Sequence, residues 1–421
     1  MKVFWNPNYC EASWPCRFAI VTVLIWGALQ AAFVHAETTI IPSAFGSGSY
    51  NSNIFLAPPS ILPPGQQISD FVGTVGGDAQ LLHKSRDVEA SLNAGGDFNM
   101  YALNTGLNYV TARVNGYVIL DRWVERLAKG AQLTVTERFH YTPEAPGFLT
   151  GAKGPVTDDP FLRGIQTFRA NTFSNTTGVN ASYPLLKALS LLGSYTFSIR
   201  RVGSIFVTTT RGSTFFDTTV HDWSVGPQHQ LTPVDSIALL FRQGLLTQEI
   251  STGSGSTIET NTQSLSVNYT RVMPNWKFEL VGGAVLVDPV SEWFPIGRMR
   301  ISNNPEQSTT VALTLSRQAT PSFFLVSGAQ ISNVGQVEIT HLLSERLTLG
   351  GSVSYAYNFL TIDESLTYQN LSAGAGINYQ LTRTIAVDLF YSYTDINIKY
   401  STPGFQVSRN QVGFSLTVQW K

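Results

Sequence analysis

The residue types that most often do chemistry are scattered in this chain. After residue 36 the histidines lie far apart, at His83, His140, His221, His229 and His341, with no HExxH motif and no GxSxG elbow. The stretch "VHDWS" at 220–224 is the best candidate for a lipase-like site, and "TDDP" at 157–160 for a divalent cation. Ser and Asn residues are abundant on the polar parity of the chain, which explains the first stretch without catalysis. A solvated turn explains the second without a bound cation. The sequence therefore predicts no enzyme, no cofactor and no metal site, with a barrel hydrolase as the less favoured alternative.

Charged side chains in alternating stretches could instead act through their electric fields. Eight of them fall on the polar parity of such stretches, so strands closing into a tube would turn them to the interior. These lumen-lining candidates are Arg138, Arg200, Arg242, Lys277, Glu279, Glu338, Asp388 and Arg409. Pairing across the lumen would stabilise the wall. Unpaired groups would create a transverse field that orders water and filters polar solutes.

The elements that would position these residues are strands, because side chains alternate with period two. In "INYQLTRTIAVDLFYSY" at 377–393, apolar residues keep one parity on both sides of a polar break at 381–384. Ser, Thr, Asn, Gln and Gly dominate the other parity. A break of about four residues is the length that joins antiparallel neighbours, so the stretch predicts a β-hairpin.

Similar breaks recur near residues 125, 186, 233, 274, 320, 344 and 382, and the connections between them are longer and more variable. Short turns on one side and long loops on the other are typical of a transmembrane β-barrel. With each break as a periplasmic turn, the pattern predicts an all-β, single antiparallel up-and-down barrel of about 16 strands. Uncertain hairpins at 71–89 and 328–335 leave roughly 14 to 18 strands possible. An even count places both termini in the periplasm.

The composition agrees with a barrel in a membrane. Of the 421 residues, 43% are hydrophobic and only 13% are charged, and the mean hydropathy is +0.03. After Phe33 no apolar run approaches the roughly 18 residues that a membrane helix needs. A soluble β-sandwich would carry more Lys and Glu on its polar face. Without a basic excess, no nucleic-acid partner is expected.

The first 86 residues are predicted to lie outside the barrel wall. Residues 1–36 are typical of a signal peptide, with the apolar run "FAIVTVLIWGALQAAF" before a small-residue cleavage site that ends at Ala36. Both cysteines, Cys10 and Cys16, belong to this segment. Residues 37–86 contain "FLAPPSILPPGQQ" and predict a flexible periplasmic arm or a plug in the lumen. The barrel would then occupy residues 87–421.

The last strand has a pattern of its own. In "NQVGFSLTVQWK", Phe414, Leu416, Val418 and Trp420 alternate with small or polar residues. This resembles the C-terminal assembly signal of outer-membrane barrels, although Lys421 places the aromatic residue next to last. The resemblance implies recognition by the barrel-assembly machinery and a place in the outer membrane of a Gram-negative-type bacterium. Aromatic residues beside the breaks predict girdles in contact with outer-membrane lipid.

A family resemblance covers about the last 100 residues, by the match of "LSAGAGINYQLTRTIAVDLFYSYTD" and "RNQVGFSLTVQW". These stretches resemble the outer-membrane β-barrel porins found with exopolysaccharide and PEP-CTERM gene clusters. The resemblance implies an envelope protein with a role in polysaccharide export or surface assembly, and periplasmic export proteins as partners. We therefore expect a passage for hydrophilic solutes or an aid to exopolysaccharide export. A structural or adhesive barrel without transport is the alternative.

Overall fold

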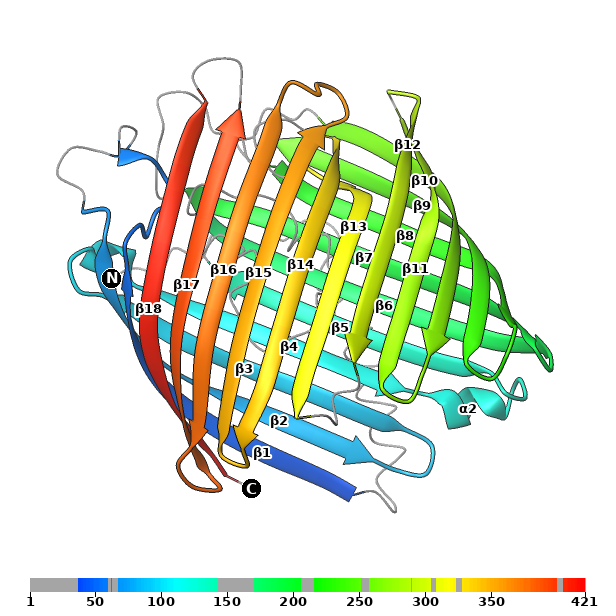
Figure 1. Cartoon of the computed structure of the whole chain (residues 1–421), viewed down its shortest axis with the longest axis horizontal. Helices are drawn as coiled ribbons and strands as arrows, with labels where there is room; N and C mark the ends of the chain where they lie inside the picture. Colours follow the sequence, from blue (N-terminus) through cyan, green and yellow to red (C-terminus); the bar gives the residue numbers. More distant parts are fainter. Residues whose placement is uncertain are drawn as a thin grey trace, which may run out of the picture.

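The chain folds into one closed antiparallel β-barrel of 18 strands (Figure 1). A computed structural model describes residues 37–59, 62, 67–142, 170–205, 216–250, 257–288, 290–303, 308–322, 328–399 and 404–420. The strands are β1 (Glu37–Asn51), β2 (Asp70–Lys84), β3 (Glu89–Tyr101), β4 (Tyr109–Ile119), β5 (Gln132–Thr142), β6 (Ala170–Leu186), β7 (Leu189–Ile205), β8 (Phe216–Gln230), β9 (Asp235–Ile250), β10 (Thr257–Val272), β11 (Trp276–Asp288), β12 (Glu292–Asn303), β13 (Thr309–Pro321), β14 (Ala329–Ser344), β15 (Leu347–Leu360), β16 (Thr367–Gln380), β17 (Ile385–Lys399) and β18 (Phe405–Gln419). Each strand pairs with its neighbours in the sequence, and β1 also pairs with β18, which closes the sheet.

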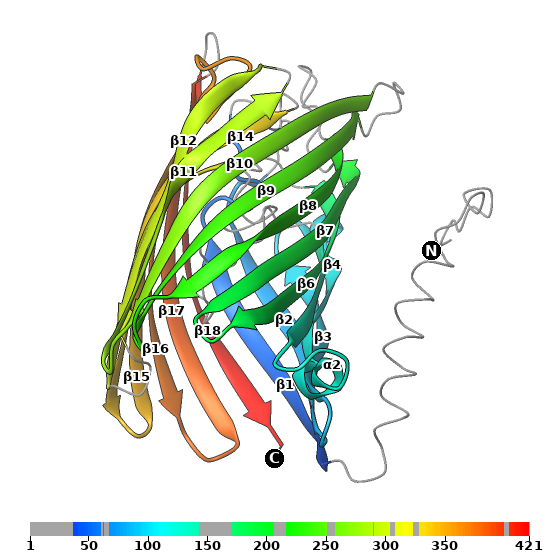
Figure 2. The same cartoon turned by 90° about the vertical axis from the view of Figure 1, so that its right-hand side faces the viewer.

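The two ends of the barrel differ in their connections. At the end that holds the start of β1 and the end of β18, here called the turn end, most connections are tight (Figure 2). The longest of them carries the short helix α2 (Asp121–Glu125) between β4 and β5. The opposite end, here called the loop end, holds the longer connections, including the short helix η4 (Thr105–Leu107). Within the described residues, no helix is long and apolar enough to cross a membrane.

The all-β barrel prediction is confirmed, and the 18 strands lie within the predicted range. The connections near 125, 186, 233, 274, 344 and 382 lie at the turn end, as expected. The prediction that the break near 320 is a turn-end connection is wrong. Strand β13 starts at the turn end, and its last residue, Pro321, lies at the loop end. The turn-end connection is the one between β12 and β13. The sixteen strands counted from the sequence nevertheless match β3 to β18 in number, and the two further strands of the barrel are β1 and β2.

The prediction for residues 37–86 also needs correction. This segment supplies β1 and β2, which pair along their whole length, so the wall begins at Glu37 and not at residue 87. The apolar parity of both strands is diluted by small residues such as Gly46, Gly73 and Gly77, which hides the alternation. Only the connection between β1 and β2 resembles the expected plug. The predicted signal peptide at 1–36 lies outside the described residues.

The outer wall carries large apolar side chains in contact with the surroundings. On β15 to β18 the exposed residues Val353, Leu371, Leu389 and Phe414 follow the outward parity across neighbouring strands. Aromatic side chains border this belt, with Tyr379 and Trp420 towards the turn end and Tyr355 and, on β2, Phe71 towards the loop end. Two aromatic levels around an apolar belt match the girdles of a membrane barrel.

Candidate site in the barrel lumen

Interactions between distant strands identify the face that is directed to the interior. Gln248 on β9 bonds through its side chain to the backbone of Ser322 and Gly328, which flank the β13–β14 connection several strands away. These contacts can form only across the inside of a closed sheet. The interior parity of β9 is therefore the one that holds Gln248 and Arg242.

All eight charged residues selected from the sequence lie on the interior parity of their strands. Arg242 is joined to Asp222 of β8 through Nε–H bonds of 2.7 and 2.8 Å. Asp388 accepts hydrogen bonds from Asn378 at 2.6 Å and from Ser415 at 3.2 Å. Arg200 and Arg409 are buried near the loop end, at 1% and 7% exposure. The other four are Arg138 on β5, Lys277 and Glu279 on β11, and Glu338 on β14.

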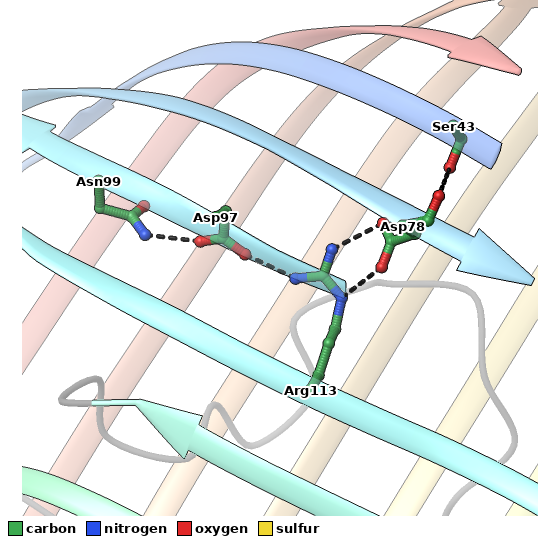
Figure 3. A network of polar contacts seen from close by, with 5 residues as sticks. All are labelled: Ser43, Asp78, Asp97, Asn99 and Arg113. Atoms are coloured by element: carbon green, nitrogen blue, oxygen red, sulfur yellow. Dashed lines mark hydrogen bonds and ion pairs between the residues drawn. The ribbon is translucent and has the colours of Figure 1, made fainter. Parts of the chain in front are cut away.

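The most compact charged group in the lumen was not selected from the sequence. Arg113 on β4 binds Asp78 on β2 in a bidentate manner, with Nε–Oδ1 at 2.9 Å and Nη2–Oδ2 at 2.7 Å (Figure 3). Its Nη1 donates to Asp97 on β3 at 2.6 Å. Asn99 donates to the other oxygen of Asp97 at 2.6 Å. Two carboxylates and one guanidinium leave this acidic cluster (Asp78, Asp97 and Arg113) with a net charge of −1.

Glycines on the interior face make room for the acidic cluster. A Cβ atom at Gly95 would lie 1.9 Å from Oδ1 of Asp78, and one at Gly76 would lie 2.6 Å from Cβ of Asp97. On β1 the ring of Phe45 lies under the guanidinium of Arg113, with 5.5 Å between Cζ and the ring centroid. The three charged side chains are 11% to 28% exposed, so water reaches them only partly. Fixed hydrogen bonds and close packing hold the cluster against the wall.

The opposite wall carries the opposite net charge. Strand β12 lies nine strands from β3 in either direction around the ring of 18, and Arg298 and Arg300 project inward from it. On β11, Nζ of Lys277 lies 2.5 Å from Oε1 of Glu279, whose other oxygen lies 3.9 Å from Arg298. Glu338 on β14 accepts a bond of 2.5 Å from Gln336. We call Lys277, Glu279, Arg298, Arg300 and Glu338 the basic wall. Three cations and two anions give it a net charge of +1.

The ion pairs between lumenal residues that the structure describes run along the wall. Each pair found among the lumenal side chains described in the structure joins residues on the same strand or on strands at most two apart. The sequence left two interpretations open, pairing across the lumen or an unpaired transverse field. The geometry combines parts of both, because lateral pairs stabilise each wall while the acidic cluster and the basic wall carry opposite net charges.

An apolar cluster narrows the interior near the loop end. After β1 the chain turns inward, and the inward segment (Asn51–Ala57) buries Ile54, Phe55, Leu56 and Ala57 at no more than 5% exposure. Leu56 has a φ of 49°, and Asn53 fixes the turn by bonding the carbonyl of Ala57 at 3.0 Å. The same cluster includes residues from β7 and from β15 to β17, which are Val202, Leu360, Tyr368, Ile396 and Ile398. The inward segment therefore bridges walls that are far apart in the ring.

The other chemical candidates do not assemble into a site. His221 of "VHDWS" lies on the outer face, where Nδ1 is 2.8 Å from the hydroxyl of Tyr195. Asp222 and Ser224 have the opposite parity and lie on the inner face. "TDDP" at 157–160 lies outside the described residues. Within the described ranges, no three metal-binding side chains converge.

Sequence reasoning missed Asp78, Asp97, Arg113, Arg298 and Arg300. Asp78 was assigned to an arm, so it was not considered as part of the wall. A signal existed for Asp97 and Arg113, because both lie on the polar parity of the alternating stretches "SLNAGGDFNMY" and "YVTARVNGYV". Only the pairing of β2, β3 and β4 brings the three charges together.

The closed sheet, the apolar belt and the charged polar interior define a porin-like transmembrane β-barrel. Residues 300–420, from the end of β12 to β18, match the family model described as "Putative beta-barrel porin 2". No curated protein sequence matches the chain.

Solved structures of outer-membrane proteins show a similar fold at low sequence identity. Pseudomonas aeruginosa OpdK with vanillate is 12% identical, with a TM-score of 0.43, and the match covers 90% of this chain and 99% of that chain. Acinetobacter baumannii OccAB4 is 8% identical, with a TM-score of 0.42 and coverage of 90% and 98%. A mutant of the ferric enterobactin receptor PfeA from Pseudomonas aeruginosa is 9% identical, with a TM-score of 0.42 and coverage of 90% and 80%.

Proposed function

We propose that this chain is an outer-membrane porin that provides a passage for small hydrophilic solutes. The observation that carries the proposal is the pair of opposed walls, with a net charge of −1 at the acidic cluster and +1 at the basic wall. The acidic cluster lies near the middle of β2 to β4, and the basic wall extends from the middle of β12 to the turn end of β11. A solute between them meets a transverse field in a space lined by polar side chains. The field aligns dipolar and zwitterionic solutes, and it slows apolar ones because they would have to displace ordered water.

The inward segment restricts the size of what passes. A barrel of 16 or more strands leaves an aqueous channel unless loops fill it, and Asn51–Ala57 occupies part of that channel near the loop end. Its apolar side chains contact both sides of the ring. Passage therefore runs beside this segment or requires it to move. Small solutes suit the first route.

Single-channel conductance of the refolded chain tests the proposal. The wild-type protein in a planar bilayer should conduct ions in steady steps. A test for a plug must leave the wall intact, so residues 37–86 cannot be removed, because they contain β1 and β2. Replacement of Ile54–Ala57 by Gly-Ser-Gly-Ser leaves all strands intact and should raise the conductance.

A silent bilayer with both proteins would contradict a porin and favour the structural or adhesive barrel, provided that each protein migrates as a folded, heat-modifiable barrel. Conductance in the wild type that is insensitive to charge substitutions on both walls would contradict the transverse field. Turnover of lipid or peptide would favour a hydrolase.

The finer assignments follow from the sequence resemblance. We propose that the turn end faces the periplasm, since short turns lie on that side in bacterial barrels. The barrel-assembly machinery would recognise the outward residues Phe414, Leu416 and Trp420. A role in exopolysaccharide export, with periplasmic export proteins as partners, would require the inward segment to open. Block of the conductance by added polysaccharide would support that role.

A further inference from the structure

Arg317 on β13 faces outward from the wall of the barrel. Arg317 on β13 has the same parity as Leu313 and Leu315, whose side chains belong to the apolar outer belt. Its neighbours on the outer face of β14 and β15 are Asn333 and Tyr357. A guanidinium in this position is costly beside hydrocarbon and needs either a counter-charge or access to the interface.

The guanidinium is held in a fixed position by neutral partners. Its Nε donates to the carbonyl of Pro295 at 3.0 Å, and its Nη1 donates to Oδ1 of Asn333 at 3.0 Å. Asn333 is itself anchored by a bond of 3.0 Å to the carbonyl of Tyr357. Cζ of Arg317 lies 5.6 Å from the ring centroid of Phe359. Among the described residues no carboxylate pairs with Arg317, and its Nη2 makes no bond to an acceptor of the wall.

An open groove of about 440 Å³ lies on the outer wall beside this arginine. Its floor is lowered by Gly297 and Gly335, which carry no side chains on the outward parity. Its sides are apolar and come from β11, β12, β13 and β15, with Leu280, Met299, Leu315 and Tyr355. The charged end is Arg317, at the level where Tyr355 and Tyr357 mark the aromatic border towards the loop end. A groove with one cationic end and apolar sides has the form of a site for a lipid with an anionic head group.

We propose that this groove binds one phosphorylated lipid of the surrounding leaflet, with its phosphate on Arg317 and an acyl chain along the groove. With the loop end outside, the leaflet at this level is that of lipopolysaccharide, and its phosphates are the anions within reach. A phosphate oxygen accepts the donors that Arg317 does not use within the wall. The proposal goes beyond solute passage and rests on the placement of the belt in the bilayer.

Binding of rough-type lipopolysaccharide to the purified full-length barrel in detergent tests this site. Native mass spectrometry and retention of labelled lipid after washing measure the bound amount. Arg317→Gln should reduce retention about tenfold, which corresponds to the loss of one charge-assisted contact. Arg317→Lys keeps the charge and should retain more lipid than Arg317→Gln. Lipopolysaccharide stripped of its phosphates should bind the wild type no better than it binds Arg317→Gln.

Two further variants separate the charge from the groove. Gly335→Leu fills the floor, where only the flexible side chain of Leu315 lies within 3.3 Å of the new Cβ, and it should weaken retention while Arg317 stays in place. Arg242→Gln, which removes an arginine from the lumen, should leave retention unchanged. Equal retention by the wild type and a folded Arg317→Gln would overturn the proposal. Preference for phosphatidylglycerol over lipopolysaccharide would overturn the assigned lipid.

Discussion

Replacement of Arg113 by Gln isolates the contribution of the acidic cluster. The substitution removes three charge-assisted hydrogen bonds and leaves Asp78 and Asp97 side by side, so the net charge of the cluster changes from −1 to −2. Breaking a fully buried ion pair costs about 3 to 5 kcal/mol. The three side chains are 11% to 28% exposed, and lumenal water stabilises the freed carboxylates. We therefore expect a loss of about 2 kcal/mol in the free energy of unfolding.

The same substitution should change ion selectivity by an amount that Coulomb's law sets. One added negative charge acts on an ion about 7 Å away in water with roughly 0.6 kcal/mol. This free energy raises the local cation concentration about threefold. The reversal potential across a KCl gradient near 0.1 M should therefore shift towards cation preference, and the shift should shrink near 1 M, where the Debye length falls to about 3 Å.

A double variant provides the control. Asp97→Asn together with Arg113→Gln restores the net charge of −1 and should return the selectivity close to that of the wild type. Unchanged selectivity of a folded Arg113→Gln channel at low salt would refute the assignment of the cluster to the ion path. A shift that persists at high salt would point to altered pore shape and not to charge.

Three further substitutions test the packing and the faces of the wall. Gly95→Val should displace the carboxylate of Asp78 and lower stability by about 2 kcal/mol, while Gly46→Val, which has open space around its Cβ, should not; urea titration followed by gel mobility measures this stability, and selectivity should stay close to that of the wild type in both variants because the net charge of the cluster is unchanged. Phe55→Ala should cost about 3 kcal/mol by leaving a cavity and should raise the conductance, whereas Leu103→Ala, at an exposed position, should change little. Leu389→Arg on the apolar belt should cost about 2 to 4 kcal/mol in lipid vesicles, and equal stability of Leu389→Arg and the lumenal Ser392→Arg would show that the two faces are misassigned.

The alternation that predicts the barrel is strongest where both faces are well marked. In β16 and β17, outward residues such as Ile377 and Leu389 are large and apolar, and the inward ones are mostly polar. In β1 and β2 the same parity carries Gly46 and Gly73, so hydropathy alone gives no clear pattern. Their place in the wall follows from pairing with β3 and β18, which is a property of the closed sheet.

The interior parity of individual charges could be read from the sequence, but their partners could not. Arg242 was selected without Asp222, although the two side chains are joined by hydrogen bonds. Strand register decides which residues become neighbours, and a slip of one residue would reverse every face. The position of the acidic cluster opposite the basic wall also depends on the number of strands, because β3 and β12 are half of the 18-strand ring apart.

The barrel closes only when β1 pairs with β18, the two strands that lie farthest apart in the sequence. Ser43 lies opposite Gln419, so the final seam joins segments separated by nearly the whole chain. Such a contact carries a large loop-closure entropy and forms slowly. Before it forms, the sheet has two unpaired edges that can join another chain. The rate of seam formation, and the protection of these edges in the meantime, should therefore limit how quickly the protein matures and how readily it aggregates.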